Sequence, residues 1–297
     1  MCFKTYQAIA KNRRVNSDRL EEARLAANDP LRIMVAPTGA LRSKRDHAAL
    51  PMTPGDIART AADCQAVGAS DLHLHVRDAN GNHSLDAGLI QECMAEVAAL
   101  APGLRIQLST DSAGYFEVTA QLRVLQRVVP EAASLNIREM ARDEAIASRL
   151  YRFAEAAEIT VQHILYGPED LRLLQDWRAR GIVPDSQSSI LCVTGRASPF
   201  LAGRPEELGR IASALRGWGG EWMVSCHGQH ELAVAVRAIG IGGHVRVGFE
   251  NNLQRPDGTL AADNAEQVAA VALAAHRAGR PLFRAPTRQD AQRRAAG

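Results

Sequence analysis

Lysine is nearly absent from this chain of 297 residues: only Lys4, Lys11 and Lys44 occur, and arginine supplies every other basic residue. The formal net charge is only +2, so no broad basic surface predicts binding to nucleic acid. We expect the short basic cluster at residues 42–45 to contact a phosphate-bearing small molecule or solvent.

Long apolar runs and paired cysteines are also missing. No run approaches the roughly 20 apolar residues that span a bilayer, and residues 1–28 lack the apolar core of a signal peptide. The five cysteines include no CxxC pair, which is typical of reduced thiols, and we expect those in apolar runs to be packing residues. These absences predict a soluble cytoplasmic protein that binds no membrane.

What the sequence does contain is a regular alternation from Leu31 onward. Short apolar runs, rich in β-branched residues, alternate with amphipathic stretches that begin at helix caps, as in a parallel sheet. The predicted strands are residues 32–36, 71–76, 105–109, 132–137, 160–165, 188–193, 221–225 and 244–248. The helices are expected to begin near residues 53, 84, 115, 141, 168, 205, 229 and 263.

This alternation predicts an α/β fold of the (β/α)8 TIM-barrel type, because a doubly wound sheet usually has fewer strands. No linker or low-complexity segment interrupts it. We therefore predict an N-terminal helical extension over residues 1–30, with a helix at 17–27, and one catalytic barrel domain over residues 31–297. The Arg-rich tail from residue 281 is expected to form a last helix.

Two histidines at the end of the second predicted strand suggest a metal site. His73 and His75 are spaced i and i+2, so on a strand their side chains point to the same side. Neutral imidazole nitrogens are good ligands for zinc and similar metals. Asp78, just beyond the pair, is a candidate to orient one of the rings. The alternative is an amphipathic strand with two ordinary polar side chains.

Polar residues also follow the other predicted strands, at the end of the barrel where catalysis takes place. Glu250, after the eighth strand, can add a carboxylate to the two histidines and leave an open position for substrate, which is typical of a catalytic metal. Small, hydroxyl, amide and imidazole groups occur at the remaining strand ends, in residues 37–40, 109–111, 134–136 and 225–228. Their convergence predicts an active site.

The segments His73-Leu74-His75-Val76-Arg77-Asp78 and Gly242 to Asn252 together resemble the β-keto acid cleavage enzyme family. Residues 36–40, 107–110 and 134–136 match in the same order, and the resemblance extends from about Leu31 to Arg288. It implies a zinc-dependent (β/α)8 barrel, usually a homotetramer. Such enzymes condense a β-keto acid with acetyl-CoA, move CoA within the adduct, and release acetoacetate and a new acyl-CoA.

The resemblance also implies roles for individual residues. His73, His75 and Glu250 would be the zinc ligands, and Ser109 and Ser134 match hydroxyl positions that contact the substrate carboxylate. Arg246 matches the arginine beside the metal, where its fixed charge suits an oxyanion or a carboxylate. We expect the substrate-binding residues to be Thr38, Gly39, Leu41, Ser109, Ser134, Asn136 and Arg246.

Two departures from the family pattern concern proton transfer. The family has an aspartate after the metal-binding glutamate and a glutamate on strand five, whereas this chain has Asn251 and the run Val161 to Tyr166. An amide cannot accept a proton, and loss of a general base typically costs about 10²- to 10⁴-fold in rate. The catalytic candidates are therefore Arg246, Asn251 and Ser109, with His163 or His227 as the base that replaces the missing acid. Each of these two histidines could equally be structural.

A third departure concerns the substrate tail. Leu41 occupies the position where a family glutamate recognises the amine of 3-keto-5-aminohexanoate, and leucine cannot pair with an ammonium group. This position predicts that the amino compound is a poor substrate and that the tail is neutral, apolar or anionic. Arg42 would favour an anionic tail if its side chain faces inward.

The loops after strands six and seven are candidates for binding CoA, because phosphate sites in barrels favour the last strands. The residues concerned are Thr194, Gly195, Arg196, His227 and Gly228. The arginines here could instead be solvated surface charges.

Two other functions compete with keto acid cleavage. Metal-dependent hydrolases with a barrel fold also use a His-x-His pair, but theirs ends strand one, is accompanied by a bridging lysine on strand four, and is completed by an aspartate after strand eight. The second alternative is a catalytically weak homologue that binds zinc and a keto acid or acyl-CoA as a sensor, which Asn251 alone favours.

Overall fold

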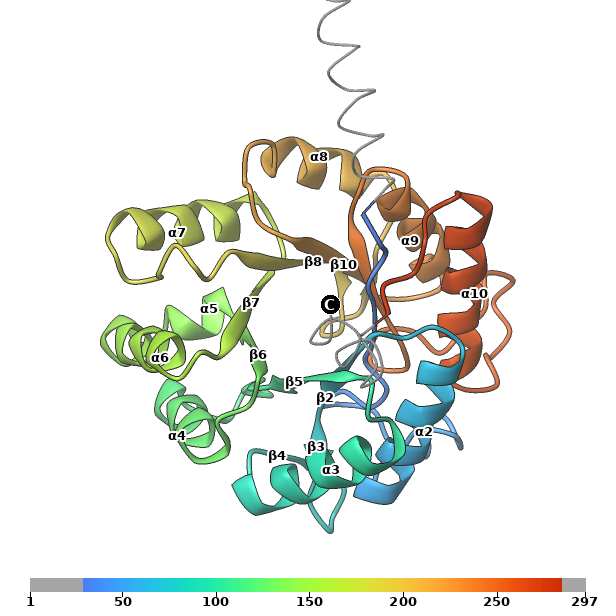
Figure 1. Cartoon of the computed structure of the whole chain (residues 1–297), viewed down its shortest axis with the longest axis horizontal. Coiled ribbons are helices and arrows are strands. Elements are labelled where there is room, and N and C mark those ends of the chain that lie inside the picture. The colour runs from blue at the N-terminus through green and yellow to red at the C-terminus, as the bar shows by residue number, and fades with distance from the viewer. Residues whose placement is uncertain (1–28, 285–297) are drawn as a thin grey trace, which may run out of the picture.

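A computed structural model of the chain describes residues 29–284, and these form a closed barrel of eight parallel strands with helices outside it (Figure 1). The barrel closes because β1 pairs with both β2 and β11. The predicted (β/α)8 fold is confirmed. The barrel strands are β1 (Ile33–Val35), β2 (Asp71–Leu74), β5 (Arg105–Ser109), β6 (Ala132–Asn136), β7 (Thr160–Leu165), β8 (Ser189–Arg196), β10 (Trp222–Cys226) and β11 (His244–Val247).

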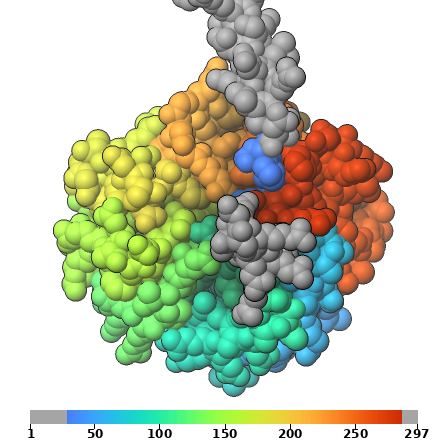
Figure 2. Space-filling model, viewed as in Figure 1, coloured from blue at the N-terminus to red at the C-terminus, as the bar shows by residue number. Residues whose placement is uncertain are grey.

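The helices surround the barrel in chain order, and Figure 2 shows the resulting ring of packed elements. Their buried faces pack on the outer side of the strands and form the main core, which includes Leu72, Leu108, Val161 and Val245. The helices are α2 (Pro54–Ala66), α3 (Ala87–Leu100), α4 (Val118–Val128), α5 (Ile137–Met140), α6 (Glu144–Ala156), α7 (Pro168–Ala179), α8 (Glu207–Ala214), α9 (Glu231–Ile239) and α10 (Asn264–Arg277).

Several helices begin two or three residues later than predicted, and in α3 and α6 the first residue follows an aspartate that caps the helix. The Asp86 and Asp143 side chains accept hydrogen bonds from the backbone N–H groups of Leu89 and Ile146, so α3 and α6 begin after these aspartates. Side-chain oxygens satisfy N–H groups that the first turn of a helix leaves free. The short helix α5 was not predicted, and it begins at Asn136, whose side chain caps it.

Two further pairs of short strands were not predicted, and both lie beside the ends of barrel strands. β3 (Val76–Arg77) and β4 (His83–Ser84) form an antiparallel hairpin whose turn includes Asp78 and Gly81, and the Gly81 φ is +81°. β9 (Leu201–Ala202) pairs antiparallel with the last residues of β8. These hairpins follow His75 and Thr194, so they extend the wall at the same end of the barrel.

Inward-facing residues alternate with outward-facing ones along each strand. Met34, Leu191, Val193 and Met223 face inward and pack together in a separate inner cluster. This cluster fills part of the barrel interior, so the polar groups described below lie above a packed core.

The cysteines of the described chain are core residues, as predicted for those in apolar runs. Cys64, Cys93, Cys192 and Cys226 are all buried and form no disulfide. Burial raises the pKa of the Cys93, Cys192 and Cys226 thiols to about 12, so they are protonated at neutral pH.

The predicted helix at residues 17–27, and most of the extension and tail that contain the other terminal predictions, lie outside the described residues. Residues 281–284 belong to the described chain and are not helical. Within residues 29–284, no helix has the length and apolar character needed to cross a membrane.

Candidate metal centre and substrate pocket

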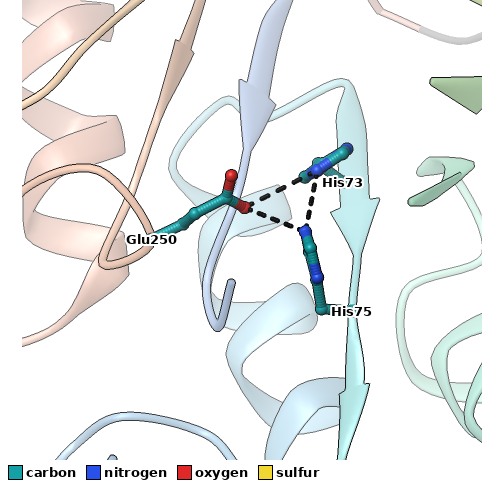
Figure 3. Close-up of side chains that lie close together, drawn as sticks. All are labelled: His73, His75 and Glu250. Atoms are coloured by element: carbon teal, nitrogen blue, oxygen red, sulfur yellow. Dashed lines mark hydrogen bonds and ion pairs between the residues drawn. The ribbon is translucent and has the colours of Figure 1, made fainter. Parts of the chain in front are cut away.

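Three acceptor groups converge at the end of β2 and β11 (Figure 3). The Nε2 atoms of His73 and His75 lie 3.1 Å apart, and Oε2 of Glu250 lies 3.6 Å and 3.5 Å from them, respectively. His73 is on β2, His75 follows it, and Glu250 comes from the loop after β11. The predicted group of metal-ligating residues is therefore brought together by the fold.

The hydrogen-bond partners of the two rings fix which nitrogen carries the proton. His73 donates from Nδ1 to Oε1 of Gln107 at 2.8 Å, which leaves a lone pair on its Nε2. His83 donates from Nε2 to the Asp111 carbonyl at 2.9 Å, so its Nδ1 is an acceptor for Nδ1–H of His75 at 3.4 Å. Both Nε2 lone pairs consequently face Glu250.

This arrangement suits a divalent cation. Burial lowers the pKa of both His73 and His75 well below the ordinary value, so the rings are neutral at neutral pH. Burial alone would raise the pKa of Glu250, but the charge of Arg246 holds it below its usual range, so Glu250 is ionised at neutral pH. Its Oε2 has no hydrogen-bond partner. Three acceptors with no donor between them are the ligand set that zinc takes in proteins.

Asp78 does not orient either histidine, and that prediction is wrong. Its Oδ1 accepts from the backbone N–H groups of Asn80 and Asn82, so it organises the exposed turn between β3 and β4. Gln107 and His83, for which no such role was predicted, contact the two rings instead. Gln107 lies inside a predicted strand, and only the register of β5 beside β2 reveals its contact.

We expect Gln107→Met to lower the affinity for zinc about 10- to 100-fold, the usual effect of losing a group that orients a metal-binding histidine. The substitution keeps the length of the side chain but leaves Nδ1–H of His73 without its acceptor. Competition with a chelating dye measures the affinity.

Gln162→Met is the matched control for this prediction, because Gln162 accepts from Gln107 inside the barrel at 3.2 Å but forms no hydrogen bond with the histidines. An equal loss of affinity in the control would show that the effect comes from general repacking of the barrel.

The position of Glu250 depends on a glycine in the turn after β1. Gly39 has a φ of +63°, and a Cβ added there would lie 2.6 Å from Cγ of Glu250. Arg77 holds this turn by donating to the carbonyls of Gly39 at 2.6 Å and Arg42 at 2.9 Å. The turn that contains the predicted substrate-binding residues Thr38 and Gly39 therefore also makes room for the side chain of Glu250.

Gly39→Ala is expected to lower zinc affinity about 10-fold or more, because displacement of a ligand costs at least as much as loss of a group that orients one. Because alanine disfavours the left-handed backbone conformation, the substitution should also lower the free energy of unfolding by about 1–2 kcal/mol. Gly181→Ala separates the two effects, since Gly181 has a similar φ of +69° with no atom within 4 Å of an added Cβ. Equal zinc affinity in the two variants would contradict the role given to Gly39.

Arg246 connects the metal centre to the pocket. Its Nη2 donates to Oε1 of Glu250 at 3.1 Å, while Nε and Nη1 are buried without a hydrogen-bond partner among residues 29–284. Buried donors without partners cost free energy, so they are the groups to which an anionic substrate would bind. Thr38 and Ser134 supply two more buried hydroxyls without partners.

A cavity of about 400 Å³ lies over the metal centre. It is lined by the three candidate ligands and by every residue predicted to bind substrate, namely Thr38, Gly39, Leu41, Ser109, Ser134, Asn136 and Arg246. The cavity is also lined by Asp111, which belongs to the predicted strand-end group 109–111, and by residues for which no role was predicted, among them Asp46, Glu139, Tyr166 and Phe200. Asp111 followed a predicted strand, but Glu139 lies in the unpredicted helix α5.

The two candidate bases lie on opposite sides of the barrel wall. His227 lines the cavity, but His163 points outward from β7, where Tyr151 donates to its Nδ1 at 3.2 Å and its Nε2 donates to the Gln187 carbonyl at 3.0 Å. His163 is therefore a structural histidine, and its prediction as a base is wrong. The strand period of two places its neighbours Gln162 and Ile164 inside instead.

Asn251 is fully buried and does not line the cavity. Its Nδ2 lies 3.5 Å from Nε2 of His227, and its carbonyl accepts from Gly228 at 3.1 Å. Burial, opposed by Glu250 and reinforced by Arg246, lowers the pKa of His227 to about 4. Asn251 thus contacts a neutral histidine that lines the cavity, but the side chain of Asn251 is not itself part of the cavity wall.

Most of the residues predicted to bind CoA lie in or beside the β8–β9 hairpin. Thr194 is buried and donates to the Ser225 carbonyl at 3.1 Å, and Gly195 packs against the backbone of β9. Arg196 is exposed and donates to the Pro199 carbonyl at 2.9 Å, while Gly228 packs beside Phe200. Only His227 of this group lines the cavity, together with Ala197 and Phe200 from the hairpin.

The fold and the site together define a class of protein: a (β/α)8 barrel in which two histidines and a glutamate that could hold a metal ion lie at the carboxyl ends of the strands. The family model for beta-keto acid cleavage enzymes matches residues 30–291. The chain belongs to that family, as the sequence analysis inferred from its motifs.

Curated relatives agree with this assignment. The chain is 29% identical over 265 residues to 3-keto-5-aminohexanoate cleavage enzyme of Fusobacterium nucleatum, covering 86% of this chain and 94% of that protein. It is 26% identical over 266 residues to 3-oxoadipate:acetyl-CoA acetyltransferase of Cupriavidus necator, covering 85% and 91%.

Among solved structures, a ternary complex of ObcA with a C4-CoA adduct and oxalate matches with a TM-score of 0.63. The identity is 16%, and the match covers 84% of this chain and 67% of that one. At this identity the likeness supports the fold alone.

Proposed function

We propose that this protein is a zinc-dependent β-keto acid cleavage enzyme. It would convert a β-keto acid and acetyl-CoA into acetoacetate and a new acyl-CoA, whose acyl group is the keto carbon of the substrate with its tail. Acetoacetate would receive its carboxylate and α-carbon from the keto acid and the other two carbons from the acetyl group, so atoms balance. The observation that carries this proposal is the set of three acceptors beside unpartnered buried donors, in a chain whose relatives' names specify acetyl-CoA as co-substrate.

His73, His75 and Glu250 would hold zinc. When bound, zinc supplies a Lewis acid that polarises oxygens of the keto acid. Arg246 would contribute its free N–H groups to the negative charge that develops on the keto oxygen when the α-proton leaves, as a preorganised donor. Thr38 would donate to the same end of the substrate, and Ser109 and Ser134 remain proposed substrate contacts along the β5–β6 wall.

His227 would accept the α-proton. It lines the cavity, it is neutral at neutral pH, and the two acids expected from the family are absent from the chain. Asn251 would act as a positioning residue, because its amide lies against the ring of His227 and can fix the ring's orientation. We keep Thr194, Gly195, Arg196 and Gly228 as proposed CoA contacts, which the β8–β9 hairpin would present near the mouth of the pocket.

A coupled assay tests the proposed function. Purified protein is incubated with acetyl-CoA and a panel of β-keto acids, and the expected result is acetoacetate and a new acyl-CoA in equal amounts. A hydrolase would form product without acetyl-CoA. A hydrolase of the kind considered would also need a bridging lysine, and within residues 29–284 no lysine lines the cavity. A sensor would show thermal stabilisation by keto acid without product.

Three further proposals follow from the sequence. A cytoplasmic location rests on the unpaired cysteines and the missing apolar runs, and one barrel domain that continues to residue 297 rests on the uninterrupted alternation of strands and helices. A homotetramer rests on family likeness. Light scattering of the purified protein tests the tetramer. A particle of the mass of one chain would contradict it.

A further inference from the structure

The turn that carries Glu250 is held by two ionisable side chains that no part of the proposed function uses. This turn, residues 248–252, follows β11 and contains both Glu250 and Asn251. Glu231, at the start of α9, binds its N–H groups, and Arg42, from the loop after β1, binds its carbonyl groups. Both contacts join segments that are far apart in the sequence.

Glu231 accepts hydrogen bonds from both ends of the turn. Its Oε1 accepts from the backbone N–H of Gly248 at 3.2 Å, and its Oε2 accepts from Nδ2 of Asn252 at 3.4 Å. The backbone N–H of Glu231 donates to the Gly228 carbonyl at 3.1 Å, directly after His227. Glu231 therefore connects the turn of a candidate metal ligand with the segment that carries the proposed base.

The burial of this carboxyl group is costly. Glu231 is 4% exposed, and within residues 29–284 it forms no ion pair. Burial raises its pKa to about 8, because a carboxylate away from water loses solvation free energy. A protonated carboxyl group still accepts through its carbonyl oxygen. An apolar side chain here would avoid the cost of burial but would leave the N–H of Gly248 without an acceptor.

Arg42 holds the carbonyl groups of the same turn. Its Nη1 donates to the Phe249 carbonyl at 2.9 Å, and its Nη2 donates to the Asn251 carbonyl at 3.3 Å. These carbonyls lie on either side of Glu250 in the chain. Arg42 lines the cavity, which was the condition set for a role at the substrate tail, but two of its nitrogens already bind the turn.

The position of the Glu250 carboxylate depends on this turn, because its side chain has few other contacts. Arg246 donates to Oε1, whereas Oε2 has no hydrogen-bond partner in the described part of the chain. The same Oε2 lies 3.6 Å from Nε2 of His73 and 3.5 Å from Nε2 of His75. Distances between a metal and its ligands vary by only about 0.2 Å, so a small shift of the turn would weaken a metal site.

We propose that Glu231 and Arg42 are positioning residues that fix the turn 248–252. Glu250 then reaches the two candidate metal-binding histidines, and Asn251 reaches the ring of His227. The inference rests on the proposed function, because these residues act through a zinc ligand and through the neighbour of the base.

Titration of the metal-free protein with cobalt(II) tests the role of Glu231, because the visible absorption of bound cobalt depends on its ligands. Glu231→Met removes both acceptors and should lower cobalt affinity about 10- to 100-fold, the usual effect of losing a group that orients a metal ligand. Glu231→Gln keeps an oxygen for the N–H of Gly248 and should restore most of the affinity. A Glu231→Met variant with a lower Tm but an unchanged affinity and spectrum would contradict the proposal.

Arg42→Lys tests the other contact, because lysine keeps the charge but lacks the planar fork that binds two carbonyls. It should lower cobalt affinity and alter the spectrum. Arg280→Lys is the matched control, since Arg280 is buried and donates to the Gly243 carbonyl at 2.7 Å, at the opposite end of β11. An equal effect in the control would contradict the proposal, and Arg42→Lys decides the matter if Glu231→Met does not fold.

The outcome is separable from that of the proposed function, because cobalt binding is measured without substrates. Weaker cobalt binding by the variants of a protein that forms no acetoacetate would support the positioning role and contradict the proposed function. Normal cobalt binding by the variants of a protein that does form acetoacetate would contradict the positioning role alone.

Discussion

Replacement of His75 with alanine is expected to abolish tight zinc binding and to lower kcat/KM by about 10³-fold or more. A bound metal stabilises the charge of the transition state by several kcal/mol, and each 1.36 kcal/mol of activation free energy changes the rate tenfold. His75 supplies one of three acceptors, and alanine cannot replace it. The two groups that remain, His73 and Glu250, are too few for a site that needs three protein ligands. Zinc content and turnover, measured on the same preparation, check the prediction.

A melting experiment separates this effect from misfolding. A metal that binds only the folded state raises Tm, so removal of zinc with a chelator should lower the Tm of the unmodified protein. The His75→Ala variant should have the same Tm with and without chelator. If the variant keeps both stoichiometric zinc and its chelator response, the His-His-Glu assignment is wrong.

His227→Gln is expected to reduce kcat by about 10²- to 10⁴-fold, the usual contribution of a general base. Glutamine preserves a polar side chain beside Asn251 but cannot accept the α-proton. Zinc content should be unchanged, because His227 is not one of the three ligands. Exchange of the substrate α-proton with deuterated solvent, followed by NMR in the absence of acetyl-CoA, should be lost in parallel with kcat.

His163→Gln is the matched control, because His163 is also buried but points away from the cavity, toward Tyr151 and Gln187. We expect lower thermal stability with kcat preserved. A His227 variant that retains its kcat would contradict the assignment of the base. A His163 variant that is fully folded but loses its kcat would contradict it as well.

The sequence predicted the barrel and the convergence of His73, His75 and Glu250, because those features depend on local pattern and strand order. Alternating apolar runs define the strands, and the rule that catalysis takes place at their carboxyl ends places Glu250 beside a His-x-His pair 175 residues earlier in the chain. All seven residues predicted to bind substrate line one cavity, for the same reason.

The errors have a different origin, since they concern contacts that depend on register. His163 and Gln162 are adjacent in the chain, yet a period of two places one behind the barrel wall and the other inside it. Gln107 reaches His73 only because β5 pairs with β2 in a particular register. His83 reaches His75 because an unpredicted hairpin folds back. Neighbours in sequence, such as Asp78, were therefore given roles that belong to residues farther along the chain.

Glu139 illustrates a further limit. It lies in a four-residue helix, α5, that is too short to produce a recognisable periodic pattern. The position of its carboxylate is fixed by Ser112 and Gln121 from the segment after β5 and from α4. Only the folded structure brings this acid and Asp111 to the wall of the same cavity.

The central claim, that the chain joins an acetyl group to the carboxylate half of a β-keto acid, is tested most directly with isotope-labelled acetyl-CoA. Zinc-loaded protein is mixed with an unlabelled β-keto acid and acetyl-CoA labelled in both acetyl carbons, and the products are analysed by NMR. The account predicts that the label is found in the acetyl carbons of acetoacetate, and that the new acyl-CoA is unlabelled. Products formed without incorporation of label into acetoacetate would contradict it.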